Sequence, residues 1–245
     1  MNYLAHYYDI YFWQNRGALA ALASVYLPVV FFFKHTMRER TPVQCGRLFG
    51  YWNTALAIGS AVGSYYTLPF LYADIQKHGL HESICLGNYI VDQPAAHAVA
   101  LFCLSKFLEF GDTLFVVFRK SRLEFLHYYH HITTCLYCWH GVHFGISTGI
   151  YFAVINLFVH SIMYSYYGIL AFGNRALVPY RHVITVIQMG VGAYVIVVWL
   201  NRCSPMYEEG EGHRLNHWLG LAMYLSYGYL FTRLLVNNLR GRREK

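Results

Sequence analysis

The sequence predicts an all-α, polytopic membrane protein with about seven transmembrane helices. Of its 245 residues, 56% are hydrophobic and only 13% are charged, and the mean hydropathy is +0.30. A soluble domain carries about 25% charged residues. The apolar residues also gather in blocks close to the length of about 20 residues that crosses a bilayer as a helix. These observations exclude a soluble enzyme, a disordered chain and a small disulfide-stabilised scaffold.

The apolar blocks mark the expected spans in chain order. No low-complexity linker or repeat interrupts them, so residues 1–245 are expected to form a single domain. The longest connection, 73–94, ends at Pro94 just before the third span. The short loops at 119–124 and 141–148 predict that the third, fourth and fifth spans are antiparallel neighbours. The spans are expected at approximately 17–33, 48–72, 95–118, 125–142, 149–171, 182–200 and 217–236.

The charged residues predict the orientation of these spans. When the amino terminus is placed on the far side of the membrane, the near side holds fourteen lysines and arginines against three glutamates. The far side holds four basic residues against seven acidic ones. Lysine and arginine accumulate on the cytosolic side of membrane proteins, so we expect a luminal amino terminus and a cytosolic carboxyl terminus. The formal net charge of +7 then indicates topology and contact with anionic lipid, or in part a polyanionic substrate, rather than nucleic acid.

The amino terminus shows no basic segment followed by a short apolar stretch and a cleavage site, so we expect no removable signal peptide. Among the six cysteines, Cys85 and Cys203 fall in two loops on the luminal side. In an oxidising compartment this pair is predicted to form a disulfide. Cys135 and Cys138 have redox-motif spacing but lie inside an apolar block, which indicates packing.

Ionisable residues inside a span are costly and are by default candidates for function. They concentrate in the third, fourth and fifth spans. In the third, Lys106, Glu109 and Asp112 follow one another in steps of three, with Thr113 next to them, and so lie along one slowly drifting helical face. A buried ion pair that only fixes helix packing is the alternative interpretation.

The fourth span opens with three histidines. His127, His130 and His131 share one face near the cytosolic end, whereas His140 and His143 lie at the other end and are interpreted as interfacial. A lone membrane histidine is usually a packing residue, but three within five positions beside acids are not explained in that way.

The fifth span carries a second polar face, which holds Asn156, His160, Met163 and Tyr167. In the sixth span, Thr185 and Gln188 lie one turn apart, and polar contact between helices is the favoured interpretation there.

Two chemistries could use histidines opposite carboxylates. Imidazoles and carboxylates bind iron, as in membrane di-iron desaturases or hydroxylases, but here a single box has only His160 as a helical companion, and His97 is isolated. The other is acid–base or nucleophilic catalysis, because a neutral imidazole can attack an activated acyl group or move a proton. A non-enzymatic seven-span receptor or transporter remains a third hypothesis.

Three blocks of the sequence are similar to those of a known family. They are Lys106-Phe-Leu-Glu109-Phe-Gly-Asp112-Thr113, Leu126-His127-Tyr-Tyr-His130-His131, and Asn156-Leu-Phe-Val-His160-Ser-Ile-Met163-Tyr164-Ser-Tyr166-Tyr167. In order and spacing they resemble the signature blocks of the ELO family, the fatty acid elongases of the endoplasmic reticulum. Thr185-Val-Ile-Gln188 looks like a partial copy of a later family motif. The absence of glutamine from 121–126 places the chain nearer the branch that acts on saturated and monounsaturated acyl chains.

The resemblance implies a very-long-chain 3-oxoacyl-CoA synthase, an acyltransferase that condenses acyl-CoA with malonyl-CoA inside a tunnel within a ring of helices. In that case His130 is the expected nucleophile, and His127 and His131 orient it or move protons. Asp112 and Glu109 would be their hydrogen-bonding partners. The pair Asn156 and His160 would stabilise the enolate formed when malonyl-CoA loses carbon dioxide, and Lys106 would hold the carboxylates. Expected substrate contacts are Lys106, Thr113, Tyr164, Tyr167 and Gln188, with Arg119, Lys120, Arg122, Arg181 and Arg233 as candidate phosphate contacts.

The resemblance also implies that no metal or other cofactor is needed and that the partners are acyl-CoA, malonyl-CoA and the lipid bilayer. Other enzymes of the elongation cycle and a second copy of the chain are further possible partners. The expected location is the endoplasmic reticulum membrane, to which the basic Arg242-Arg243-Glu244-Lys245 end adds weak support.

Overall fold

The computed structural model describes residues 1–174, 181–203 and 211–243, and within them the side chains other than those at 181–188, 211, 235 and 237–243. The described residues form helices and short connections, with no strand among them, which confirms the all-α prediction. In chain order the helices are α1 (Tyr3–Tyr8), the π-helical turn η1 (Asp9–Trp13), α2 (Arg16–Thr36), α3 (Gly46–His78), α4 (Leu80–Leu86), the 3-10 turn η2 (Asn88–Val91), α5 (Gln93–Leu108), α6 (Phe110–Phe118), α7 (Phe125–Phe144), α8 (Gly149–Ala171), α9 (Arg181–Val198), the π-helical turn η4 (Trp199–Cys203) and α10 (Glu211–Arg243).

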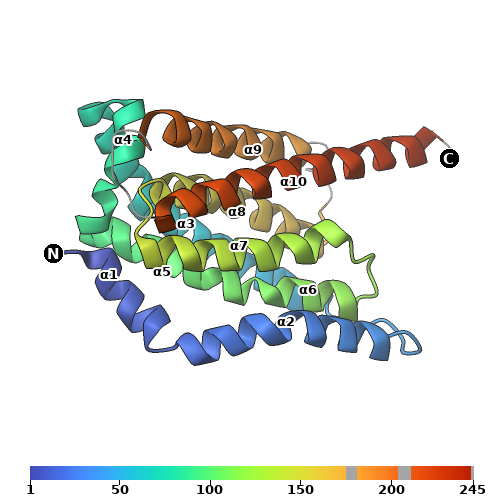
Figure 1. Ribbon diagram of the computed structural model, residues 1–245. Coiled ribbons are helices and arrows are strands. Elements are labelled where there is room, and N and C mark those ends of the chain that lie inside the picture. Colours follow the sequence, from blue (N-terminus) through green and yellow to red (C-terminus); the bar gives the residue numbers. More distant parts are fainter. Residues whose placement is uncertain (175–180, 204–210, 244–245) are drawn as a thin grey trace.

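The long helices run side by side along one axis (Figure 1). Helix α2 lies along one edge of the bundle, where it packs on α6 and α7, and α9 and α10 lie along the opposite edge. The connections at 37–45 and 119–124 lie at one end, with the end of α10, and we call this the basic end. The other end holds α1, α4 and η4, and we call it the disulfide end.

Each predicted span corresponds to helical structure, and the third is divided. Its residues form α5 and α6, separated by Glu109. By length and apolar composition α2 and α8 qualify as membrane-crossing helices among the described residues. Large apolar side chains point outward from several helices, including Phe32, Ile58 and Leu225, which are 64%, 61% and 67% exposed. Such a surface suits contact with lipid.

The predicted packing of the third, fourth and fifth spans is correct only in part. Helix α5 packs on both α7 and α8, but α7 and α8 pack mainly on other helices rather than on each other. The most extensive helix–helix packing joins α8 to α3 instead. The short loop 145–148 therefore holds the two helices together at the disulfide end without closing the space between them.

The disulfide end is closed by paired side chains and a covalent link. Cys85 of α4 is bonded to Cys203 of η4, with Cα atoms 5.3 Å apart, so the structure brings together the two predicted cysteines. Next to this link the ring of Trp199 stacks on His217. The hydroxyl of Tyr89 donates to the carbonyl of Ile146 over 2.7 Å. These contacts hold α4, η4 and the neighbouring helix ends together at the disulfide end.

Candidate active site

A cavity of about 950 Å³ lies between α7, α8 and α10. It begins in the middle of the bundle at Phe102, Tyr137 and Cys138 and reaches Glu124 and Leu234 at the basic end. We call it the chamber. It brings together most of the predicted site residues, because its lining includes Lys106, Asp112, His127, His130, His131, Asn156, His160, Tyr164 and Tyr167.

The first motif spans the end of α5 and the start of α6. A single continuous helix was expected here, and the chain stays right-handed helical at Glu109 (φ −60°, ψ −16°), with a local tightening between α5 and α6. The residues of the motif face different neighbours. Lys106 and Glu109 face α8, whereas Asp112 faces α3 and the next turn of α8.

Lys106 and Glu109 form a buried ion pair in the wall of the chamber. Lys106 Nζ donates to Glu109 Oε1 over 2.6 Å, and both side chains are almost fully buried. The same ammonium group donates to Asn156 Oδ1 over 2.8 Å and lies over the ring of Phe102. Burying a charge is costly unless it is paired, so these contacts are needed to keep the carboxylate ionised inside the bundle.

His160 is held against the same carboxylate. Its Nδ1 lies 3.5 Å from Glu109 Oε1, which leaves the rest of the ring on the chamber side. The amide nitrogen of Asn156 is also left to the chamber, because Lys106 takes the amide oxygen. The pair predicted to stabilise an enolate therefore borders one space. The amide nitrogen of Asn156 is a hydrogen-bond donor there, whereas a neutral His160, whose Nδ1–H points to Glu109, has Nε2 as an acceptor.

Two buried polar atoms next to these groups have no hydrogen-bond partner among the described residues. They are Glu109 Oε2 and His131 Nδ1. Buried side-chain polar atoms are satisfied in the large majority of cases. The two atoms mark a place where a bound molecule can supply the missing partner.

Asp112 is oriented by two donors from different helices. The indole N–H of Trp52 donates to Asp112 Oδ1 over 2.6 Å, and the hydroxyl of Tyr164 donates to Asp112 Oδ2 over 2.8 Å. Gly111 permits this approach, because a Cβ there would lie 2.7 Å from the Trp52 ring. The sequence argument missed Trp52, since nothing in the pattern of an apolar span shows which tryptophan will reach a carboxylate on another helix.

The three histidines of the box occupy the first two turns of α7, as their spacing predicts. The rings of His127 and His131 are in contact, with centroids 4.6 Å apart, and His130 lies beside Tyr227 of α10. His127 Nε2 lies 3.1 Å from Thr113 Oγ1. Among the described residues, no hydrogen bond occupies the ring of His130, so both its nitrogens are available to a molecule in the chamber.

Thr113 does not line the chamber, although it was expected to contact substrate. It is fully buried behind His127 and is hydrogen-bonded to Tyr26 of α2 over 2.7 Å. The prediction failed because the Thr113 hydroxyl contacts Tyr26 and His127 instead of the chamber. Tyr26 lies outside the motif blocks, and the sequence argument missed it as well.

The comparisons with known proteins agree with the family resemblance of the three motif blocks. Residues 11–245 match the ELO family, described as the GNS1/SUR4 family. The chain belongs to the ELO family. All the residues of the chamber named above fall inside the matched region. The resemblance drawn from the three motif blocks is thereby confirmed.

Relatives in this family are similar over most of their length. The chain is 34% identical over 241 residues to very long chain fatty acid elongase 4 of Trypanosoma cruzi, covering 95% of this chain and 84% of the relative. It is 38% identical over 218 residues to very long chain fatty acid elongase 6 of Drosophila melanogaster, with 85% and 68% covered. Against human very long chain fatty acid elongase 6 the identity is 31% over 236 residues, with 95% and 87% covered.

The predicted phosphate contacts whose side chains are described lie outside the chamber lining of this ELO protein, and they are Arg119, Lys120, Arg122 and Arg233. Lys120 donates to the carbonyls of Arg38 and Arg40, over 2.9 and 3.1 Å, and so ties the α2–α3 connection to the α6–α7 connection. The guanidinium of Arg119 lies over the ring of Phe49. Lys120 is thus already engaged by the protein, a use that its charge alone does not reveal.

The remaining predicted contacts are distributed around the basic end. Arg122 pairs with Glu124 over 2.7 Å and is 85% exposed, which keeps it near the mouth of the chamber. Arg233 is exposed on α10. Arg181 and Gln188 lie on α9, and their side chains are outside those that the structure describes.

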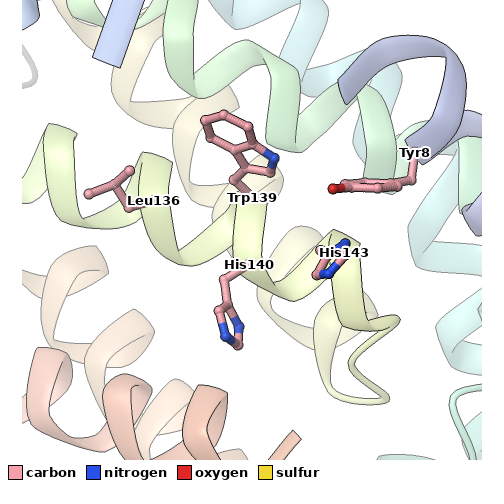
Figure 2. A pocket seen from close by; sticks show the side chains of 5 residues that line it. All are labelled: Tyr8, Leu136, Trp139, His140 and His143. Atoms are coloured by element: carbon pink, nitrogen blue, oxygen red, sulfur yellow. The ribbon is translucent and has the colours of Figure 1, made fainter. Parts of the chain in front are cut away.

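His140 and His143 lie apart from the histidine box, as predicted. They line a separate recess of about 280 Å³ near the disulfide end, together with Tyr8, Leu136 and Trp139 (Figure 2). His140 turns away from Tyr8 and is hydrogen-bonded to Asn216 over 3.0 Å. Within the described part of the chain, no three or more His, Cys, Asp or Glu side chains are arranged to hold a metal ion.

Proposed function

We propose that this protein catalyses the condensing step of very-long-chain fatty acid elongation. A long-chain acyl-CoA and malonyl-CoA would give 3-oxoacyl-CoA, CoA and carbon dioxide. Membership of the ELO family and the names of its relatives, which are very long chain fatty acid elongases, support the pathway. The observation that carries the reaction is that His130, Asn156, His160 and Lys106 border one chamber, with Glu109 held behind its wall by Lys106 and His160.

In the first step the neutral imidazole of His130 attacks the thioester carbonyl of acyl-CoA. The C–S bond breaks, CoA leaves with a proton, and the acyl group stays on the histidine as an acyl-imidazole. Covalent catalysis divides one difficult step into two easier ones. The support for His130 is that no hydrogen bond occupies its ring among the described residues and that it borders the chamber.

In the second step malonyl-CoA loses carbon dioxide, and the electrons of the broken C–C bond form an enolate. The amide nitrogen of Asn156 is the donor that faces this charge, and preorganised donors of this kind are a large term in catalysis. His160 borders the same space and, with its Nδ1–H toward Glu109, can accept a proton at Nε2. The enolate carbon attacks the acyl carbonyl, the C–N bond to His130 breaks, and the imidazole takes up a proton from solvent to regain its neutral form. The product is two carbons longer and remains a CoA thioester.

We further infer that the long helices cross the membrane of the endoplasmic reticulum seven times, with the amino terminus luminal and the carboxyl terminus cytosolic. The basic end then faces the cytosol, where CoA substrates are found. The disulfide between α4 and η4 supports a luminal position for the other end. Arg119, Arg122, Arg181 and Arg233 remain candidate contacts for the CoA phosphates.

The test is condensation with labelled malonyl-CoA. Membranes that contain the protein are supplied with a panel of saturated and monounsaturated acyl-CoAs, and labelled 3-oxoacyl product is measured. We expect product with the wild-type protein and a loss of about 10³-fold or more for His130→Ala, because removal of a nucleophile abolishes covalent catalysis.

A matched control is present on the same helix. His143→Ala removes an imidazole at the disulfide end that does not border the chamber, and it is expected to keep wild-type activity. No labelled product with any acyl-CoA, or equal activity of the two variants, would refute the proposed function.

A further inference from the structure

Helix α2 contributes one buried polar side chain to the interior of the bundle. Its buried residues are Leu19, Tyr26 and Val30, and only Tyr26 carries a polar atom. The hydroxyl of Tyr26 lies 2.7 Å from Thr113 Oγ1, and the same oxygen lies 3.1 Å from His127 Nε2. A chain of three hydrogen-bonding groups therefore links α2 through α6 to the histidine box on α7.

The Tyr26 ring is held in place independently of its hydroxyl. It stacks on the ring of Phe110, with centroids 4.0 Å apart and an interplanar angle of 17°. Tyr26 is 4% exposed and Thr113 is fully buried, so water does not compete for their hydroxyls. The ring packing would be served equally well by phenylalanine, and a buried hydroxyl costs free energy unless it is hydrogen-bonded.

The chemistry of the three groups decides which way their protons point. Each hydroxyl has one proton to donate. A phenol is more acidic than an aliphatic alcohol and is the better donor, so Tyr26 donates to Thr113. The proton of Thr113 is then directed to His127 Nε2. An imidazole nitrogen that accepts a hydrogen bond carries no proton, so the neutral ring of His127 holds its proton on Nδ1.

We propose that Tyr26 is a positioning residue, which acts through Thr113 to keep the Nε2 of His127 unprotonated and its ring in one orientation. Neither Tyr26 nor Thr113 borders the chamber, whereas His127 does. The ring of His127 thus accepts a hydrogen bond on the side away from the chamber and keeps its Nδ1–H as a donor for the reaction. Where the test measures condensation rates, this inference rests on the proposed function.

A double-mutant cycle tests the relay. Tyr26→Phe keeps the stacked ring and removes only the hydroxyl, and we expect kcat to fall about tenfold with KM within about twofold, since a hydrogen bond of this kind contributes about one order of magnitude. Thr113→Val is expected to cost at least as much. The double variant should be no slower than Thr113→Val alone, because Tyr26 acts only through Thr113.

Two further variants separate positioning from packing. Thr113→Ser keeps the hydroxyl and should retain most of the activity. Tyr89→Phe removes another buried hydroxyl, which donates to the carbonyl of Ile146 at the disulfide end, and should lower the melting temperature without changing kcat. An unchanged kcat for Tyr26→Phe, or multiplying losses in the double variant, would overturn the relay.

A measurement that needs no turnover distinguishes failure of the relay from failure of the proposed function. Diethyl pyrocarbonate modifies an imidazole at its unprotonated nitrogen, and peptide mass spectrometry reports the rate at His127. We expect several-fold faster modification in Thr113→Val than in wild type, because Nε2 is no longer engaged. A smaller increase is expected in Tyr26→Phe, where Thr113 keeps its bond to Nε2 but its hydroxyl is no longer fixed by Tyr26. Equal rates would refute the relay, whereas a wild-type protein that does not condense malonyl-CoA would refute only the proposed function.

Discussion

The two ends of the bundle bury polar side chains in different ways. At the disulfide end the groups are paired with each other. Asn88 donates to Asp74 over 2.8 Å, and Thr148 Oγ1 lies 3.0 Å from His217 Nε2. The Cys85–Cys203 link then holds α4 against η4. The result is a closed cap whose polar atoms are used up within the protein.

The chamber is built from the same kinds of residue, but some of its buried polar atoms have no hydrogen-bond partner among the described residues. Three buried side-chain atoms in the described part of the chain have no hydrogen-bond partner, and they are Glu109 Oε2, His131 Nδ1 and the hydroxyl of Tyr137. All three belong to residues in or directly behind the chamber wall. Unpaired buried polar atoms are costly, so the difference between the two regions supports the proposal that the chamber, and not the disulfide end, binds a ligand.

The largest expected effect on stability is at the ion pair of the chamber wall. Lys106→Met leaves the buried carboxylate of Glu109 without its ammonium partner, and removing one member of a buried pair costs about 3–5 kcal/mol of unfolding free energy. Thermal unfolding of the purified protein measures the change. The double variant Lys106→Met, Glu109→Gln should recover much of the stability but none of the activity. If the single variant is as stable as the double one, the carboxylate is not held as a charged group by Lys106.

The disulfide is expected to matter for stability and not for chemistry. Cys85→Ala opens a link between residues 118 positions apart, and loss of a native disulfide typically costs about 2–4 kcal/mol. The melting temperature should fall, while condensation measured well below it should stay near the wild-type rate. A large loss of kcat in fully folded Cys85→Ala protein would show that the cap also shapes the chamber.

A matched pair of hydrogen-bond deletions compares the two ends directly. Trp52→Phe removes one of the two donors to Asp112, and we expect a fall in kcat of about tenfold, because a hydrogen bond contributes about 0.5–1.5 kcal/mol. Asn88→Leu removes the donor to Asp74 and should lower stability by about 1–3 kcal/mol with kcat unchanged. If both variants lower kcat, or both lower only the stability, the proposed difference between the two ends is wrong.

The smallest effect is expected at the exposed rim of the basic end. Arg122 is largely exposed and its pair with Glu124 is a surface ion pair, which contributes about 0–1 kcal/mol. Arg122→Ala should leave the melting temperature unchanged and raise the KM for acyl-CoA about two- to threefold at low salt, a difference that screening removes at high salt. An unchanged KM at low salt would exclude Arg122 from phosphate binding.

Much of the candidate site could be predicted because its groups lie at helical spacing. The three positions of the box, and the positions of Asn156 and His160 one turn apart, share a face through the geometry of a single helix. Those assignments need no knowledge of the neighbours. The sequence also predicts that Cys85 and Cys203 lie in two loops on the same side of the membrane, because the side of each loop follows from the number of spans and from the distribution of charge.

Other features depend on which helices pack together, and local pattern does not contain that information. Trp52 and Tyr26 are ordinary aromatic residues of apolar helices until α3 and α2 are placed against α6. Lys120 is one basic loop residue among several until its ammonium group meets the carbonyls at Arg38 and Arg40. The separation of α7 from α8, which makes room for the chamber, likewise follows from the preference of α8 for α3.

The sequence by itself determined the helical class, the family and the faces that carry the polar groups, because hydropathy and spacing act within one helix. Tertiary structure alone decided which atoms meet between helices and which are left unpaired. It brought Lys106 against Asn156 and Asp112 against Trp52. The physical reason is that a buried polar group must find its partner in three dimensions, and the partner is found on another helix far away along the chain.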